Sequence, residues 1–189
     1  MACLAIPALA VVLLVGGDLS SGSVTTASVP ELQVSSEAFR AGEALPQPYT
    51  CYNVLEPSPP INWSNGPLGT RAYVLVMDAP ERPGGIGVQW LVYNLPADVL
   101  DMAEATPAVE RLASGALQGR NDAGKVGYSA PCPPANVTYV YRFTVYAIDG
   151  RLSTGHAASS PDVMSAMDGH VLARGEITTT YLRPSWPWG

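Results

Sequence analysis

The sequence predicts an all-β fold with one or two short helices at its C-terminal side or periphery. Three observations support this class. Glycine and proline each occur 18 times among the 189 residues, and both break long helices. Apolar residues make up 47% of the chain, which is enough to build a packed core. Several segments alternate apolar and polar residues or form short apolar runs, and both patterns are typical of strands.

The first element expected is an apolar leader, residues 1–28. The run from Cys3 to Val15 has the length of a signal-peptide core and is shorter than the roughly 20 residues of a membrane-spanning helix. Small and polar residues follow it, and Ser21-Gly22-Ser23 and Thr26-Ala27-Ser28 are both candidate cleavage sites. We therefore expect an exported protein of the cell envelope, periplasm or extracellular space. No Lys or Arg precedes the run, so a short uncleaved membrane anchor is an alternative. A lipoprotein is the other alternative, although Cys3 lies at the start of the run rather than at its end.

The domain begins with short strands separated by loops. Glu31–Ser36 alternates and predicts a first strand. Phe39–Pro48 and Tyr49–Pro60 are rich in turn-forming residues and predict loops. Ile61–Ser64 predicts a short strand, which ends in the turn Asn65-Gly66-Pro67.

The central strands follow. Arg71–Asp78 is apolar at both alternating sets of positions, which indicates a strand covered on both faces. Ala79–Gly87 is a Pro/Gly loop that leads into a second buried strand, Val88–Leu95. Ala97–Ala105 predicts a helical turn, and Leu112–Gly127 predicts a glycine-rich connection.

The C-terminal part predicts a long strand, a helix and a closing strand. The long strand, Tyr139–Asp149, places on one face the residues Tyr139, Tyr141, Phe143, Val145 and Ala147. In the helix, Ser160 is the expected N-cap and Pro161 the first helical residue. The apolar residues at helical spacing are Val163, Met167, Val171 and Leu172. Ile177–Leu182 closes the domain, and residues 184–189 form a tail rich in proline and tryptophan.

The charge of the chain argues against nucleic acid as a partner. The net charge is −6 with only ten Lys and Arg, and these are scattered rather than clustered. Anionic membrane surfaces are disfavoured for the same reason, so we expect membrane association only through the leader.

Signatures of catalysis are mostly missing. His156 and His170 are the two histidines, and neither has the spacing of paired metal ligands, so we expect no metal and no cofactor. A nucleophile elbow, a phosphate-binding loop and a dinucleotide fingerprint are all absent from the sequence. Asp78 and Glu81 lie close in one loop and are the remaining candidates for acid–base work, although such residues more often cap turns. We therefore expect a protein that is not an enzyme.

Two cysteines, Cys51 and Cys132, remain once the leader is removed. In an exported chain this pair predicts one disulfide, which closes a long loop. Two buried free thiols are the alternative.

Several segments match a set of motifs in order. They are Ser58–Ser64 (S-P-P-L-x-W-S), Ala72–Pro83 (the strand that enters D-P-D-A-P), Gln89–Pro96 (H-W-V-V-Y-N-I-P), Gly127–Pro134 (G-Y-x-G-P-x-P-P), Tyr139–Asp149 (H-R-Y-x-F-x-x-Y-A-L-D), Gly169–Ala173 and Thr180–Arg183. In these motifs the chain resembles the phosphatidylethanolamine-binding protein family, also called Raf-kinase-inhibitor-like proteins, in its bacterial branch. The resemblance covers about residues 31–183.

The resemblance implies a β-sandwich-like Greek-key fold and a small pocket for phosphate-type groups. One wall of that pocket corresponds, by this resemblance, to the segment that contains Ala130, Pro131 and Pro134. Tyr141 stands at the position of the family's pocket tyrosine.

The chain departs from the family at the polar anchors of the pocket. The first aspartate of D-P-D falls on Ala79 and the second on Glu81, while a shift by one residue would instead offer Asp78. Gln89 and Tyr139 replace the two histidines. Both can donate hydrogen bonds but stay neutral, so we expect weak phosphate binding that changes little between about pH 5 and 7.

The sequence leaves two functions open. The first is an exported, non-catalytic binding protein for a small anionic or head-group-type ligand. The second is a protein-interaction module with a degenerate pocket, such as an inhibitor of a partner protease or kinase; here the tryptophans of the tail would suit a contact surface.

Overall fold

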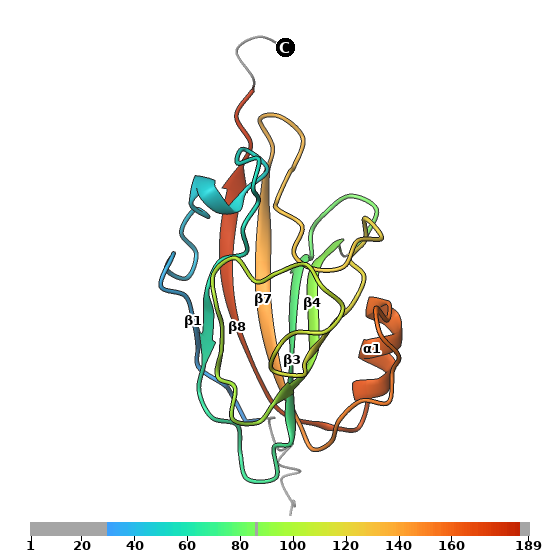
Figure 1. Ribbon diagram of the computed structural model, residues 1–189. Helices are drawn as coiled ribbons and strands as arrows, with labels where there is room; N and C mark the ends of the chain where they lie inside the picture. The colour runs from blue at the N-terminus through green and yellow to red at the C-terminus, as the bar shows by residue number, and fades with distance from the viewer. Residues whose placement is uncertain (1–29, 86, 186–189) are drawn as a thin grey trace, which may run out of the picture.

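The computed structural model describes residues 30–85 and 87–185; the predicted leader, Ile86 and the end of the tail lie outside these ranges. The chain forms two antiparallel sheets and, within the described residues, one α-helix, which confirms the predicted fold class (Figure 1). The small sheet has the order β1 (Val34–Ser35), β2 (Ile61–Trp63), β5 (Asp101–Met102). The large sheet has the order β6 (Leu117–Gln118), β4 (Gly87–Pro96), β3 (Ala72–Ala79), β7 (Thr138–Ile148), β8 (Val171–Leu182).

The inner face of the large sheet packs against the small sheet and its flanking loops. Because side chains alternate along a strand, β3 and β7 each send every second residue to this face. The buried residues gathered there include Ile61, Trp63, Tyr73, Leu75, Met77, Ala79, Tyr141, Phe143 and Val145. The larger of the two apolar clusters therefore lies between the sheets.

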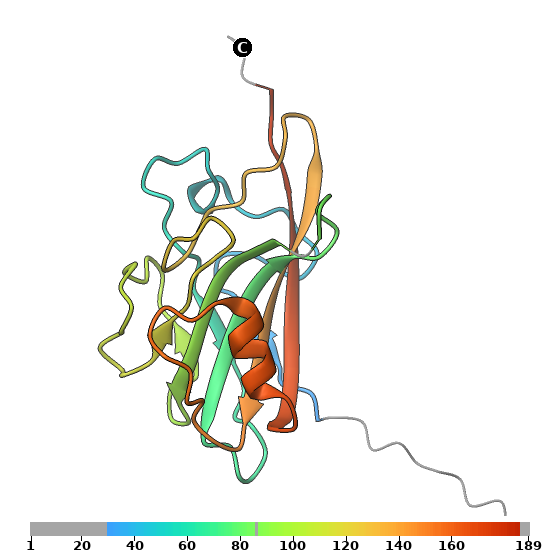
Figure 2. The same cartoon turned by 90° about the vertical axis from the view of Figure 1, so that its right-hand side faces the viewer.

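The other face of the large sheet is covered by α1 (Ser160–Met167), as Figure 2 shows. We call it the helix face. Val163 and Met167 of α1 are buried there. The sheet residues of this second cluster include Ala72, Val74, Val76, Val88, Leu91, Tyr93 and Ile148. Burial on both faces explains why β3 is apolar at every position except Asp78.

The predicted helix was wrong at both ends. Its N-cap is Ser159, whose side chain accepts a hydrogen bond from the Asp162 N–H, and Ser160 is already helical. The helix stops at Met167 because Gly169 follows with φ +77°, a left-handed conformation that ends helices. The residues predicted to extend it, Val171 and Leu172, instead begin β8.

Other predicted boundaries also change. The helical turn predicted over Ala97–Ala105 is wrong, since this stretch contains turns and the short strand β5. The closing strand is longer than predicted, because β8 pairs with β7 along almost its whole length. A single 3-10 turn, Gln47–Tyr49, interrupts the first predicted loops.

The outer edge of β8 is covered by the segment that precedes β2. Backbone hydrogen bonds join Leu32 to Arg174, Gly42 to Thr178 and Leu45 to Thr180. Gly175 permits this close approach, since a Cβ there would overlap the carbonyl group of Leu32.

Three loops meet at one end of the sandwich, at the top of Figure 1. They are residues 46–60, the β3–β4 loop from residue 80, and residues 127–137, which precede β7. We call this the loop end.

Candidate functional site

Two of the predicted pocket residues, Asp78 on β3 and Tyr141 on β7, lie on opposite faces of the large sheet. Ala79 and Tyr141 belong to the cluster between the sheets. Asp78 pairs in register with Arg142, on the helix face, and its Oδ2 accepts a hydrogen bond from Arg142 Nη2 at 2.9 Å. Asp78 therefore cannot replace the aspartate of the family pattern by a shift of one residue, because that shift moves the carboxylate through the sheet.

Gln89 lies at an irregularity of the sheet. Met77 pairs with Trp90 and Asp78 pairs with Val88, so Gln89 is the extra residue of a β-bulge. Its carbonyl oxygen accepts a hydrogen bond of 2.9 Å from the N–H of Ser129. This bond fastens the loop before β7 to β4, and the Gln89 side chain keeps part of its surface exposed.

The two tyrosines at the start of β7 differ in exposure. Tyr141 is only 2% exposed, whereas Tyr139 is half-buried, and their ring centroids are 6.5 Å apart. Burial raises the pKa of Tyr141, and the neighbouring Tyr139 and Tyr181 raise it further, against an opposing effect of the Arg82 charge. Tyr141 is thus a neutral hydrogen-bonding group at the back of the site.

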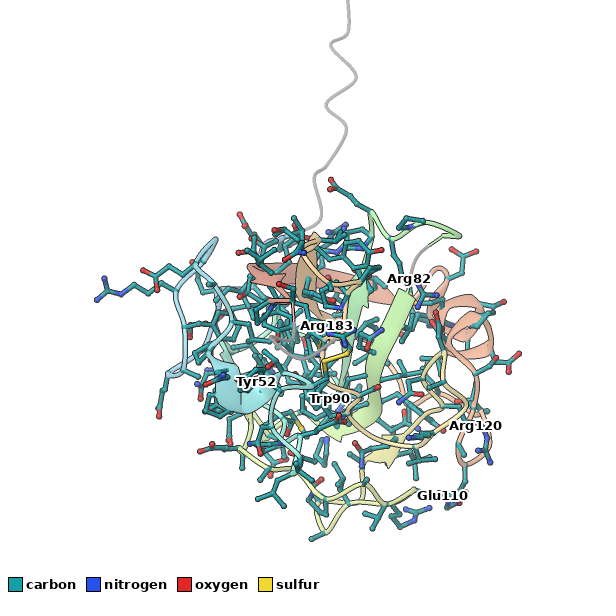
Figure 3. The ribbon with its side chains drawn as sticks, turned by 90° about the horizontal axis from the view of Figure 1, so that it is seen from above. Tyr52, Arg82, Trp90, Glu110, Arg120 and Arg183 are labelled. Atoms are coloured by element: carbon teal, nitrogen blue, oxygen red, sulfur yellow. A yellow bond between two sulfur atoms is a disulfide. The ribbon has the colours of Figure 1, made fainter. Side chains whose placement is uncertain are left out.

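The loop before β7 forms a rigid wall. Ala130 and Pro131 are buried, whereas Pro134 is exposed. The Pro131 carbonyl accepts a hydrogen bond from the N–H of Cys51 at 3.1 Å. Cys51 and Cys132 form a disulfide that joins this loop to residues 46–60, and Figure 3 shows it near the centre of the loop end, close to Arg183.

Tyr128 connects the same wall to the core. Its ring meets Trp90 edge-on with centroids 5.7 Å apart, and its hydroxyl donates to the Tyr49 carbonyl at 2.6 Å. Trp90 in turn donates from Nε1 to Gln118 Oε1 at 2.8 Å. These bonds satisfy the polar atoms of a largely apolar wall, so the wall is pre-organised.

Arg82 is a residue of the loop end that the sequence reasoning missed. Its guanidinium lies against Gly87, where a Cβ would meet Nε at 2.8 Å, so a larger residue at this position would displace the arginine side chain. Arg82 makes a long, exposed ion pair of 3.4 Å with Asp122, and its charge lowers the pKa of Tyr141. The signal was an arginine in the loop that resembles D-P-D-A-P; the other predicted residue of that loop, Glu81, is exposed.

The two histidines contact side chains that do not belong to the predicted pocket. His170 Nδ1 is 2.8 Å from Asp149 Oδ1, and His156 Nε2 is 3.2 Å from Arg111. Across the described part of the chain, no three His, Cys, Asp or Glu residues gather as a metal site would require. No described helix has the length and apolar character needed to cross a membrane.

A sequence model described as "Phosphatidylethanolamine-binding protein" matches residues 35–182. The chain belongs to the phosphatidylethanolamine-binding protein family. A UPF0098 protein of Methanothermobacter thermautotrophicus is 36% identical over 80% of this chain and 99% of its own length. A UPF0098 protein of Aquifex aeolicus is 40% identical over 80% of this chain and 89% of its own length.

Solved structures agree with this assignment to the phosphatidylethanolamine-binding protein family. A structure titled as a putative family homologue from Chlamydia trachomatis has a TM-score of 0.73 at 35% identity, covering 81% of this chain and 98% of its own. YbcL of E. coli, titled a new member of the mammalian family, has a TM-score of 0.72 at 30% identity, covering 80% and 98%. Within this family fold, the Gln89 carbonyl holds the loop that contains Ala130 and Pro131, and the Tyr139 and Tyr141 rings lie 6.5 Å apart. The charge of Arg82 acts on Tyr141.

Proposed function

We propose that this chain is an exported, non-catalytic binding protein that holds a small anionic or head-group-type ligand at the loop end. The membership of a family described by its binding of phosphatidylethanolamine supports a binding role. The disulfide supports folding in an oxidising compartment outside the cytosol. Non-catalysis is supported by the neutral side chains that stand at three of the family's polar anchor positions, Ala79, Gln89 and Tyr139, while Glu81 keeps a carboxylate at the fourth.

The observation that carries the proposal is the position of Arg82. Its guanidinium rests on Gly87, which pairs with Ala79, and its charge acts on Tyr141. The charge of Arg82 thus acts on Tyr141 at the loop end, and the Tyr141 ring lies 6.5 Å from that of Tyr139. Since an arginine stays charged at all relevant pH values, it favours anions without titrating. This explains how a phosphate-type ligand is held without the family's histidines.

The test is an NMR titration of the ¹⁵N-labelled protein with inorganic phosphate and phosphoethanolamine at about pH 5 and about pH 7. We expect shifts at Gln89, Ala130 and Tyr139, with affinities for phosphate that agree within about twofold between the two pH values. Phosphoethanolamine that binds more tightly than phosphate would identify a head group rather than a free anion as the ligand.

Arg82→Gln should weaken phosphate binding by about tenfold, because it replaces a charge-assisted hydrogen bond by a neutral one. Arg174→Gln is the matched control; Arg174 lies in an exposed pair with Glu176 on β8, so its loss should leave phosphate binding unchanged. The absence of shifts at millimolar phosphate and phosphoethanolamine would refute an anion site at the loop end.

A second function, a protein-interaction module, is favoured by one feature of the same end. Val54 and Leu55 are 97% and 86% exposed, next to a cavity of about 460 Å³ whose wall includes Lys125 and Tyr128. Exposed apolar residues beside a hollow are typical of contact surfaces. A partner enzyme that is inhibited by the wild type and not by Val54→Asp with Leu55→Asp would favour this function over ligand binding.

A further inference from the structure

A part-buried ion pair lies on the helix face, on the opposite side of the large sheet from Tyr141. Asp78 and Arg142 are directly opposite each other on β3 and β7. The side chain of Asp78 is 9% exposed, and its neighbours on this face include Val76 and Val88. A charge pair in such apolar surroundings costs desolvation energy unless its remaining polar atoms find partners.

Those partners are missing on both sides of the pair. Asp78 Oδ1 and Arg142 Nε are buried and have no hydrogen-bond partner among the described residues. One of these atoms is an acceptor and the other a donor. Buried polar atoms in native proteins are normally satisfied, so two orphans on one ion pair indicate a missing group that both donates and accepts.

A cavity of about 350 Å³ borders the pair. The first turn of α1 leaves this part of the sheet uncovered, and Met164 and Pro161 form the helix side of the cavity. On the sheet side its wall includes Val76, Asp78, Val88, Arg142 and Tyr146. This volume lies within the range of small-molecule sites in proteins, and the mixture of mostly apolar walls with a few polar groups is typical of them.

The charges around the cavity largely cancel. Asp78 is paired with Arg142, and the other carboxylate of the wall, Asp122, accepts from Arg82 and from the Val88 N–H. An ionic ligand would therefore lose its hydration without gaining an unpaired partner of opposite charge. A neutral ligand suits the site better.

We propose that this cavity is a binding site for a small neutral molecule that carries a primary carboxamide or a hydroxyl on an apolar body. The polar group donates to Asp78 Oδ1 and accepts from Arg142 Nε, while the apolar body contacts Val76, Val88 and Met164. Because neighbouring side chains now cover both orphan atoms, a side chain of the wall must move to admit the ligand. Met164 is suited to this role, since it is 40% exposed and methionine has three rotatable side-chain bonds.

The experiment uses benzamide and benzyl alcohol as probes, with toluene and benzoate as matched compounds that lack the neutral polar group. NMR of the protein labelled at methionine and valine methyl groups reports binding through Met164, Val76 and Val88. We expect benzamide and benzyl alcohol each to bind at least about tenfold more tightly than toluene or benzoate, because only these two can both donate to Asp78 and accept from Arg142.

The double variant Asp78→Leu with Arg142→Leu tests the cause of this preference. Replacing a whole buried ion pair by apolar residues is often neutral or stabilising, so the variant should fold. It should bind toluene at least as tightly as benzamide. The control, Arg174→Leu with Glu176→Leu, removes an ion pair that lies outside the cavity wall and should keep the wild-type preference.

Three results would overturn the proposal. If the wild type bound benzamide and toluene with equal affinity, Asp78 Oδ1 and Arg142 Nε would not be binding the carboxamide group. Amide shifts at Gln89 and Tyr139 in a ¹⁵N-labelled sample, without a shift of the Met164 methyl group, would place the probe at the loop end. No shift with any probe would mean that the cavity holds water alone. The two proposals use different probes, phosphate for the anion site and neutral compounds for this cavity, so either proposal can fail while the other stands.

Discussion

Tyr128 illustrates at the scale of one residue how the loop end is held. Its hydroxyl donates to the Tyr49 carbonyl, and burial raises its pKa well above the ordinary value of 10.0. The folded state therefore favours the neutral phenol of Tyr128 over the phenolate. A group with a raised pKa in the folded state contributes stability that is complete below its unfolded pKa and is lost as the pH rises above it.

We expect the free energy of unfolding to fall above about pH 10, with Tyr128 contributing up to about 1.4 kcal/mol per pH unit. Tyr128→Phe should lose about 1 kcal/mol at neutral pH, the net value of one hydrogen bond, and should show a shallower decline above pH 10. Urea unfolding over this pH range measures both effects. Tyr52→Phe, at an exposed residue, is the control; equal slopes for wild type and Tyr128→Phe would contradict the assignment.

At this scale the sequence could give the position of a residue along the chain more readily than the face of the sheet to which its side chain points. The family pattern predicts pocket roles for Pro131, Pro134 and Tyr141, and these roles stay predictions. Asp78 is a predicted pocket residue, yet the alternation of β3 sends it to the helix face. Arg82 was missed because an arginine in the loop motif does not by itself reveal the contact that the side chain makes with Gly87 of the next strand.

At the scale of an element, the start of α1 shows which of two neighbouring serines is the N-cap. The sequence predicted Ser160 as its N-cap, because Pro161 follows it, whereas the structure uses Ser159. Pro is tolerated throughout the first turn of a helix, so it does not distinguish the two choices.

Ser159→Ala should therefore lower the free energy of unfolding by about 1 kcal/mol, since it removes the cap, whereas Ser160→Ala should change it by a few tenths at most. Thermal and urea unfolding of the two variants decide between the positions. A larger loss in Ser160→Ala than in Ser159→Ala would reverse the assignment.

The strand β8 shows why element boundaries are harder to predict than elements. Val171 and Leu172 fit a helical spacing from Val163, and they also fit the start of a strand. The choice is made by tertiary pairing, because β8 finds β7 as a partner from Val171 onward. Periodicity over so few residues carries no information about that partner.

At the scale of the whole molecule, the composition and the order of motifs were sufficient for the fold class and the family. The number of strands in each sheet was not predictable, because β5 and β6 have only two residues each and exist through pairing alone.

The disulfide is the covalent constraint of the whole molecule, since it joins two residues 81 positions apart. Replacing both cysteines by alanine should lower the free energy of unfolding by about 4 kcal/mol in the chain-entropy model. Urea unfolding of the variant and of the oxidised wild type gives the difference. The wild type under strong reductant should match the variant; a stability unaffected by either change would show that the crosslink does not constrain the unfolded chain.

The covered margins of the large sheet have a consequence for association. An open strand margin invites another chain to add itself by backbone pairing, which leads to fibrils or swapped assemblies. Here residues 30–45 occupy one margin, along β8, and residues 117–122 occupy the other, along β4. Another chain therefore cannot pair directly with the outer backbone of β8 or β4 along these covered stretches. A second molecule that approaches β8 or β4 there must be recognised through side chains.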